Sequence, residues 1–402
     1  MKKFIYLCGM MLLSLNMMAQ IDLNDRNWEA VLIEHFDEDA SYWQWDTLRF
    51  LNTGDYSWKA YLNSIAPKGE HEVYQFGNCL IDTTNNTMRL VAYYDSTNIQ
   101  QNNYYLPKWM WPENGGNGYP INDSLFYSSG AIEYYKQHYV QSEDERKFLY
   151  GYFEIKCKLP QHPGTFPAFW LHDSSKDSID PHYEEIDIFE HTRNLLHYPP
   201  YGANPNPPQT QDSSRVFTTG IYYNNSGNKA NHEDESFARN FPVIPRTMAD
   251  LSNWHVFSCE WQPGSVTWFF DGEEVNQSSP TDSIPHRPMR LKVNYAIDDY
   301  ACPRNNPIWF GSDTMTIDYI KVYQLKWDCG TDEIITCQDE LDNFNYSVKN
   351  SINISSTTEE VIIENNDKVT FRVTDGFEIT GPFLVESGGE FTIIRQDCPN
   401  GN

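Results

Sequence analysis

The chain has 402 residues, and its 56 acidic side chains outnumber 29 basic ones, which gives a formal net charge of -27 at pH 7. This surplus repels phosphate backbones and anionic lipids, so it argues against nucleic acid as a partner and, more weakly, against a densely sulfated substrate. The length allows one large β domain with a smaller unit beside it, and we expect a monomer.

The first 19 residues have the layout of a signal peptide. Lys2 and Lys3 precede an apolar run from Phe4 to Met18, which ends at the small residue Ala19. An uncleaved membrane anchor is the alternative, but Asn16 interrupts the run, which is shorter than the roughly 20 residues that a spanning helix needs. We therefore expect export to the periplasm, the cell surface or the medium, and no membrane span.

Short segments rich in Val, Ile, Tyr, Phe and Trp recur between Gly, Pro, Asn and Asp clusters, a rhythm typical of an antiparallel sandwich or barrel. Asp271-Gly272 lies between two apolar runs and predicts a tight hairpin. Two stretches, 102–129 and 195–244, have the composition of long surface insertions rather than strands. In the first, Trp109 and Trp111 could stack on sugar rings or bury their own loop.

From about Trp327 the aromatic residues thin out, and Ser, Thr, Asn and Glu alternate with Val and Ile. This pattern predicts a small accessory β module over residues 328–402, after a domain over residues 20–327. A spacer, a carbohydrate-contacting unit and a sorting element are all open roles for it.

Seven cysteines follow the signal segment, so at least one thiol is unpaired within a monomer. Cys157 and Cys259 lie in strand-like apolar runs and are expected in the core. Two of the three cysteines near the C-terminus, Cys329, Cys337 and Cys398, could pair in an oxidising compartment.

Acidic residues concentrate in the segment 183–191, YEEIDIFEH. Strand alternation places Glu185 and Asp187 on one face and Glu184 on the other. Glu190 would fall on the wrong face, unless a one-residue β-bulge around Ile188 or Phe189 returns it to the carboxylate face, as bulges beside active sites do. An acidic edge strand in solvent is the alternative, but the interleaved apolar residues require a packed rear face.

Two carboxylates about 5 to 5.5 Å apart suit a retaining glycosidase, in which one attacks the anomeric carbon and the other protonates the leaving oxygen. The segment resembles the bulged ExDxxE signature of glycoside hydrolase family 16, the laminarinases, agarases and their relatives. KFLYGYFEIKCKLP, GTFPAFWL, NWHVFSCEWQPGSVTWFFDGEEV, MRLKVNYAI and MTIDYIKVYQ resemble the family's other strands in the same order, so the likeness spans roughly Glu34 to Gln324.

The resemblance implies an all-β fold, a concanavalin-like β-jelly-roll sandwich with a concave substrate cleft, and a secreted endo-hydrolase of a β-linked polysaccharide. Position by position, Glu185 is the nucleophile and Glu190 the general acid and base. Asp187 holds the nucleophile and helps Glu190 keep its proton, because a neighbouring anion raises the pKa of an acid.

Other candidate residues follow from the same comparison. Tyr183 shares the face of Glu185 and could stack beneath a sugar or pack on a loop. Trp170 matches a tryptophan common in the family, with core packing favoured over substrate contact. Asn294 resembles a position near the cleft, and His191 alternates away from the acid.

No cofactor is required, although many family members hold a structural calcium on the convex face. Asp318 matches one contributing position. At the other, Glu34-His35-Phe36-Asp37 stands where the family often has an Asp-Glu-Phe triplet, so one expected ligand is replaced.

A β-1,3- or β-1,3/1,4-glucan is the expected substrate. Galactans of the agar, porphyran or carrageenan type are the alternative, because both long insertions match no pattern. A non-catalytic carbohydrate-binding jelly-roll and a transglycosylase are the competing functions, since this fold also serves binding proteins.

Overall fold

The computed structural model describes residues 26–37, 41–45, 48–53, 56–60, 64–65, 72–74, 76–94, 127–137, 147–162, 165–175, 180–191, 218–224, 250–278, 284–297 and 312–399. The expected signal peptide, together with Trp109 and Trp111, lies outside these ranges. Within them, no helix has the length and apolar character needed to cross a membrane.

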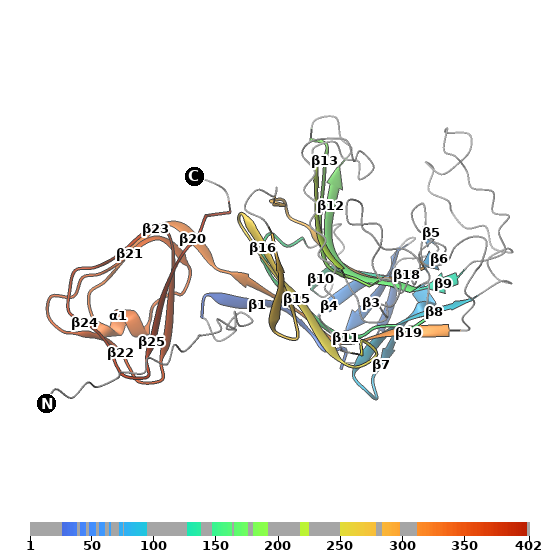
Figure 1. Cartoon of the computed structure of the whole chain (residues 1–402), viewed down its shortest axis with the longest axis horizontal. Coiled ribbons are helices and arrows are strands. Elements are labelled where there is room, and N and C mark those ends of the chain that lie inside the picture. The colour runs from blue at the N-terminus through green and yellow to red at the C-terminus, as the bar shows by residue number, and fades with distance from the viewer. Residues whose placement is uncertain are drawn as a thin grey trace, which may run out of the picture.

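The larger unit is a β-jelly-roll in which two sheets pack face to face, as the sequence predicted (Figure 1). The strands of the first sheet run in the order β17 (Glu273–Gln277), β16 (Ser265–Phe270), β15 (His255–Gln262), β11 (Gly151–Lys158), β19 (Ser312–Leu325), β8 (Thr87–Tyr94), β9 (Tyr127–Ser129), β6 (Glu72–Tyr74) and β5 (Ser64–Ile65), with β1 (Trp28–Glu34) paired to β19 and β7 (Cys79–Asp82) to β8. A 3-10 turn, η1 (Phe76–Asn78), leads into β7.

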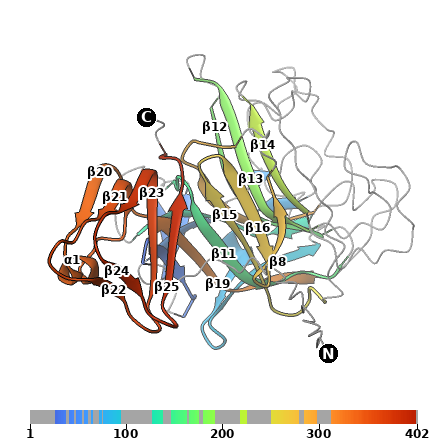
Figure 2. The same cartoon turned by 60° about the vertical axis from the view of Figure 1, so that its left-hand side comes forward.

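The second sheet carries the acidic segment. Its order is β14 (Thr218–Asn224), β13 (His182–Glu190), β12 (Thr165–Ser175), β18 (Arg290–Ile297), β10 (Ala131–Gln137), β4 (Tyr56–Ala60), β3 (Leu48–Thr53) and β2 (Ser41–Trp45). Figure 2 shows β12, β13 and β14 side by side. β13 is thus an inner strand, paired on both edges.

One core cluster fills the space between the two sheets. Alternate residues of β11, including Ile155 and Cys157, pack in it, and Cys259 joins them from β15. Both cysteines are fully buried free thiols, as predicted, and burial raises the pKa of each well above its usual value. The predicted hairpin joins β16 to β17, where Asp271 and Gly272 both take positive φ, as a type I′ turn requires.

The insertion over 195–244 contains a strand that the sequence analysis did not predict. Residues 218–224, TTGIYYN, form β14 and pair with the outer edge of the acidic strand β13. The segment alone carries little apolar periodicity, but the open edge of β13 supplies partners for its backbone groups. Gly220 lies directly opposite Asp187.

The C-terminal unit is a small β-solenoid with its own core. β20 (Trp327–Ile335), β21 (Val348–Ile354), β23 (Lys368–Ile379) and β25 (Glu390–Arg395) form a parallel sheet, β22 (Val361–Ile363) pairs with β24 (Phe383–Val385), and α1 (Gln338–Asp342) follows β20. The Phe371 ring is central, with the rings of Phe344 at 4.9 Å and Phe391 at 5.6 Å.

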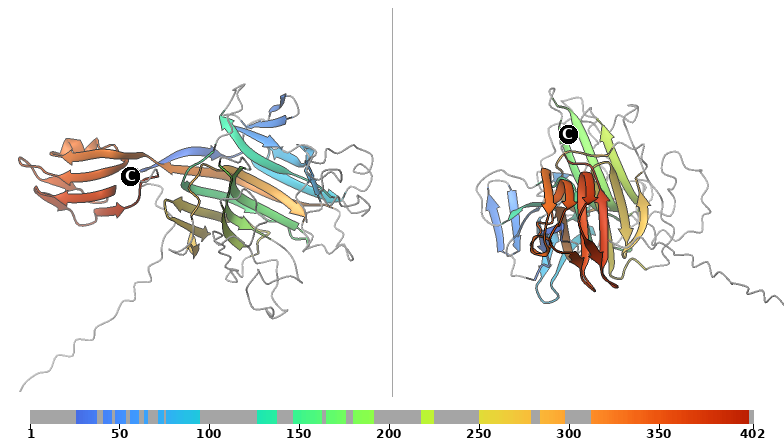
Figure 3. Two further views of the ribbon diagram at one scale, coloured as in Figure 1. Left: turned by 90° about the horizontal axis from the view of Figure 1, so that it is seen from above. Right: turned by 90° about the vertical axis from the view of Figure 1, so that its left-hand side faces the viewer.

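The solenoid continues directly from the sandwich. A single residue, Lys326, separates β19 from β20, and Figure 3 shows the chain running from one unit into the other. Trp28, Tyr152 and Val348 bury one another in a cluster that joins the two units. The Asn27 amide also donates to the Thr370 carbonyl oxygen at 2.7 Å. The solenoid is therefore fixed against the sandwich by packing as well as by the chain.

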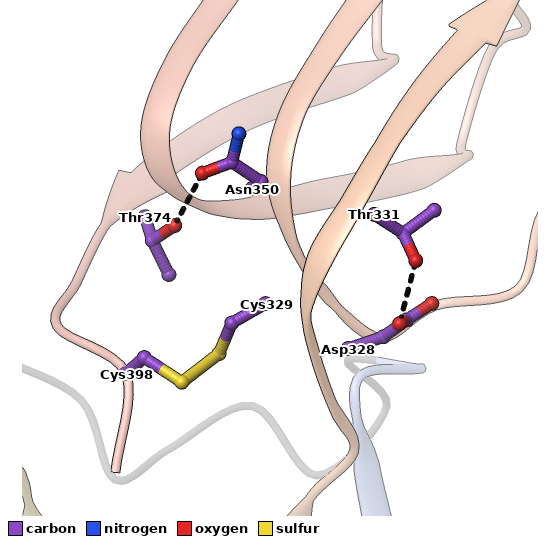
Figure 4. The surroundings of a disulfide bond; sticks show 6 residues. All are labelled: Asp328, Cys329, Thr331, Asn350, Thr374 and Cys398. Carbon is purple, nitrogen blue, oxygen red and sulfur yellow. Dashed lines mark hydrogen bonds between the residues drawn. A yellow bond between two sulfur atoms is a disulfide. The ribbon is translucent and has the colours of Figure 1, made fainter. Parts of the chain in front are cut away.

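A disulfide between Cys329 and Cys398 closes the solenoid, one of the pairings that the sequence left open (Figure 4). The two Cα atoms are 6.2 Å apart, and 69 positions separate the cysteines in sequence. Beside the disulfide, Thr331 donates to Asp328 at 2.7 Å and Thr374 to Asn350 at 3.2 Å. Cys337 is a free thiol.

We expect the double substitution Cys329→Ser, Cys398→Ser to lower the free energy of unfolding of the solenoid by about 2–4 kcal/mol, because it releases a long closed loop in the unfolded chain. Calorimetry of the full chain should show the solenoid transition at a lower temperature and the sandwich transition nearly unchanged. Cys337→Ser is the matched control and should change neither. Equal melting of the double variant and the parent would contradict this role.

Candidate active site

A β-bulge in β13 brings three carboxylates to one face. Opposite β12, Asp187 pairs with Trp170 and Phe189 with Phe169, so Ile188 is the extra residue. On the β14 side, Asp187 pairs with Gly220 and Glu190 with Thr218, so β13 advances three residues where β14 advances two. The bulge therefore stands where the sequence required it, and Glu190 returns to the face of Glu185 and Asp187.

The rear face of the same strand is anchored in the core. Ile186, Ile188 and Phe189 are almost completely buried in the sandwich cluster, and the Phe189 ring lies 4.5 Å from that of Phe257. On the other face, Glu185 and Asp187 are each 1% exposed, whereas Glu190 at the strand end is partly exposed. Two of the three acids are thus held inside the protein, and the third reaches solvent.

A hydrogen bond from the opposite sheet supports the bulge. The buried indole of Trp268, on β16, donates from Nε1 to the carbonyl oxygen of Asp187 at 2.9 Å. A bulge interrupts the ladder of backbone hydrogen bonds, and a buried carbonyl without a donor is costly. Trp268 therefore supplies a donor at the point where the strand kinks.

Tyr183 lies on the face of Glu185, as expected, but it has a contact that the sequence analysis did not foresee. Its hydroxyl donates to Glu185 Oε2, and its ring meets that of His172 edge to face at 4.9 Å. Burial raises the pKa of Tyr183 far above its usual value, and the nearby Glu185 carboxylate raises it further. The phenol therefore stays protonated and remains a donor to Glu185.

Trp170 does not pack in the core, which corrects the favoured expectation. It is partly exposed and lies in one row across the sheet with Asp187, Lys292 and Glu133. The bulge in β13 shifts its register against β12 at this point. Trp170 therefore lies opposite Asp187 rather than Ile188, and it shares the outward face with Asp187. Its Nε1 donates to Asn294 Oδ1 at 2.7 Å, which joins two of the residues singled out from the sequence.

A lysine that the sequence analysis missed occupies the middle of this row. Lys292 Nζ lies 4.7 Å from the Trp170 ring centre, 3.5 Å from Glu133 Oε2 and 3.4 Å from His172 Nδ1. Burial lowers the pKa of Lys292, and the Glu133 carboxylate opposes that shift. Its position two residues before Asn294 was the available signal, because strand alternation gives both the same face.

Glu184 points the other way from Glu185, as expected, and anchors the strand on that side. Its carboxylate is fully buried, and Oε2 accepts the backbone N–H groups of His286 and Arg287, both at 2.9 Å. The Arg287 guanidinium lies 3.5 Å from Glu184 Oε1 and binds Asp180 with two hydrogen bonds of 2.7 and 2.9 Å. Glu184 on β13 and Asp180 just before it thus fix the segment that leads into β18.

His191, which follows the acidic strand, is fully buried, and its backbone N–H donates to the Pro167 carbonyl oxygen at 3.0 Å. It therefore helps to fix the end of β13 against β12.

The two segments that carry the expected calcium ligands lie side by side, since Glu34 on β1 pairs with Ile320 on β19, but the side chains of Glu34 and Asp318 have other partners. Asp318 Oδ2 lies 2.6 Å from the ammonium of Lys156, which already neutralises it. Glu34 is buried and accepts the Phe36 N–H at 2.7 Å and the Trp58 indole N–H at 3.0 Å. Within the described ranges, no group of three His, Cys, Asp or Glu side chains is arranged to hold a metal.

Comparisons with known proteins agree with this geometry. The profile described as "Glycosyl hydrolases family 16" matches residues 121–321, half of the chain, including the bulged strand. The chain belongs to family 16 of the glycosyl hydrolases. This is a family of retaining, endo-acting glycoside hydrolases.

Two curated relatives carry names of endo-acting polysaccharide hydrolases. "Endo-1,3-1,4-beta-glycanase ExsH" of Rhizobium meliloti (strain 1021) is 29% identical over 202 residues, which are 50% of this chain and 34% of that protein. "Glucan endo-1,3-beta-glucosidase A1" of Niallia circulans is 23% identical over 306 residues, which are 71% of this chain and 36% of that protein. The chain spans about a third of the length of these relatives.

Among solved structures, the catalytic domain of an endo-1,3-beta-glucanase (laminarinase) from Thermotoga petrophila RKU-1 is similar. The identity is 19% and the TM-score 0.46, with 74% of this chain and 98% of that chain covered.

We expect Glu184→Gln to lower the free energy of unfolding by about 1–3 kcal/mol, because the amide keeps one acceptor but removes a buried charge that two N–H groups and Arg287 share. Asp180→Asn is the matched control, because Asp180 is largely exposed and surface pairs contribute about 0–1 kcal/mol. Urea unfolding measures both. A loss for Glu184→Gln no larger than for Asp180→Asn would show that the buried carboxylate does not anchor β13.

Proposed function

We propose that this chain is an exported endo-β-glycosidase that hydrolyses a β-1,3- or β-1,3/1,4-linked glucan with retention of configuration. The observation that carries the proposal is the bulged strand β13, which gives Glu185, Asp187 and Glu190 one common face. A protein that only binds sugar has no need of three carboxylates gathered at the expense of their mutual repulsion.

The two outer carboxylates are suited to different parts in a double displacement. Glu185 is buried and held by the Tyr183 hydroxyl, as a nucleophile that must keep its place requires. Its carboxylate would attack the anomeric carbon while Glu190 gives a proton to the departing glycosidic oxygen. Water would then attack the glycosyl-enzyme ester and lose its proton to Glu190, which restores both groups. Glu190 is the more exposed acid, as this exchange with water requires.

Asp187 lies between the two other acids along β13 and is as buried as Glu185. An anion at this position would favour the protonated form of a neighbouring acid, which suits Glu190 as a proton donor near neutral pH. We propose this as its role, along with holding Glu185 in place.

The charges on this face favour an uncharged polysaccharide. Lys292, the cation in the row that contains Asp187 and Trp170, lies 3.5 Å from the Glu133 carboxylate. This cation is therefore already compensated, whereas a sulfated galactan would need a free one. The name of the Niallia circulans relative, a glucan endo-1,3-beta-glucosidase, supports a β-glucan as well.

Glu185→Ser should lower kcat on the polysaccharide at least about 10⁴-fold, because the variant loses the carboxylate proposed to form the glycosyl ester. The assay is release of reducing ends from laminarin, lichenan, agarose, porphyran and carrageenan. Turnover of laminarin or lichenan by the parent supports the glucan assignment, and cleavage of galactans alone contradicts it. Turnover at a near-parental rate by the serine variant would overturn the mechanism.

The two roles can be separated by chemical rescue with azide on an aryl glycoside whose leaving group needs no proton. Azide should restore cleavage by Glu185→Ala and give a glycosyl azide of inverted configuration, since it attacks the face that the nucleophile vacates. With Glu190→Ala, the product should have retained configuration, because Glu185 still forms the ester first. The opposite pairing of products would exchange the two assignments.

Tyr183→Phe should lower kcat by about 10- to 100-fold, the effect of losing a hydrogen bond to a buried charged group. An unperturbed tyrosine side chain has a pKa of about 10, and the raised pKa of Tyr183 keeps its hydroxyl protonated above that pH. The ratio of parental to variant rates should therefore stay constant from neutral pH to about pH 10. A ratio that collapses in mildly alkaline solution would show that the phenol ionises there.

A further inference from the structure

We propose that the outer face of the eleven-stranded sheet carries a second carbohydrate-binding site, separate from the carboxylates, in a hollow beside Trp254. The inference rests on the proposed function for its ligand, a segment of the polysaccharide that the chain cuts. The hollow has a volume of about 480 Å³, and its lining includes Trp254, Lys158, Asp318, Arg89 and Asp82.

The hollow lies across neighbouring strands on the side away from β13. Met88, Ile317 and Cys157 point into the core, so Thr87, Asp318 and Lys158, one residue along each strand, point outward. Three inter-strand spacings separate β15 from β8, a width of about 14 Å, which accommodates a short oligosaccharide segment. The sandwich core separates this face from Glu185, so one sugar cannot occupy both places.

Trp254 offers a fixed apolar surface at one end. The residue is 36% exposed, and it is the one exposed Trp, Tyr or Phe among residues whose burial is described. Lys158 Nζ lies 4.8 Å and Lys156 Nζ 5.6 Å from the ring centre, so cation–π contacts hold the indole. An exposed, restrained indole is the kind of surface on which the apolar face of a sugar ring packs.

The rest of the lining supplies hydrogen-bonding groups of both kinds. The Arg89 side chain is 44% exposed, and its Nη2 lies 3.9 Å from Asp82 Oδ2. This ion pair is loose, so the guanidinium N–H groups of Arg89 can donate to a ligand. Asp82 is held in place, because the backbone N–H groups of Thr84 and Asn85 donate to its Oδ1 at 3.2 and 3.3 Å and the Asn85 amide donates to its Oδ2 at 3.1 Å. Its Oδ2 can accept one further hydrogen bond, since a carboxylate oxygen has two lone pairs.

Charges of both signs line the hollow, and Asp318 is already paired with Lys156 beside it, so neither sign dominates. Balanced donors and acceptors beside an aromatic ring suit a neutral ligand rich in hydroxyl groups rather than an anion or a cation. A polymer held there would keep its remaining length near the chain, and this effective concentration would raise affinity for long polysaccharides only.

The test is native gel electrophoresis of the full chain, made inactive by Glu185→Ser, in gels containing laminarin or lichenan. Addition of Trp254→Ala or Arg89→Ala should weaken retardation about tenfold in apparent Kd. Ile33→Ala is the matched control, since it removes another exposed apolar side chain from a strand of the same sheet and should leave retardation unchanged. Unchanged retardation in both hollow variants would overturn the proposal.

A second measurement uses the active chain. Trp254→Ala should raise KM for the long polysaccharide and leave hydrolysis of a short oligosaccharide unchanged, and an equal loss on both would contradict a separate site. The two proposals fail separately. If the parent cuts a polysaccharide whose retardation does not depend on Trp254, only the second site is overturned. If Trp254 contributes to retardation of a polysaccharide that the parent never cuts, only the proposed hydrolase activity is overturned.

Discussion

The candidate site depends on a single extra residue in β13. Ile188 inserts one position into a strand whose rear face is fixed by core packing of Ile186 and Phe189. Because strand alternation has a period of two, Glu190 would otherwise point into the core. The Trp268 indole satisfies the carbonyl of Asp187 at the kink, so the distortion is supported from the opposite sheet.

Two of the buried carboxylates on this strand have stabilising partners. Glu184 is stabilised by backbone N–H groups and Arg287 on one side, and Glu185 by the Tyr183 hydroxyl on the other. Lys292 adds a cation to the outward row that contains Asp187. A cluster of acids can be buried only with such compensation, since desolvation and mutual repulsion both disfavour the anions.

The two units of the chain are joined more tightly than a composition shift alone indicates. β19 and β20 are separated by one residue, and Trp28 near the start of the described chain packs against Val348 of the solenoid. Packing from both ends of the chain fixes how the solenoid sits on the sandwich. The proposed second site would lie on the outer face of the eleven-stranded sheet, away from both the three carboxylates and the solenoid.

The sequence by itself determined the acidic strand and the apolar strands that resemble the family, the Asp271-Gly272 hairpin and the common face of the acids, because alternation and turn chemistry act between neighbours. It also required the bulge, since no flat strand could place Glu190 beside Glu185. Only the tertiary structure decided that Trp170 faces outward, that β14 completes the sheet, that Lys292 joins the site and that Asp318 pairs with Lys156. These contacts join residues far apart in the chain, and partners of that kind are set by how the sheets assemble rather than by local pattern.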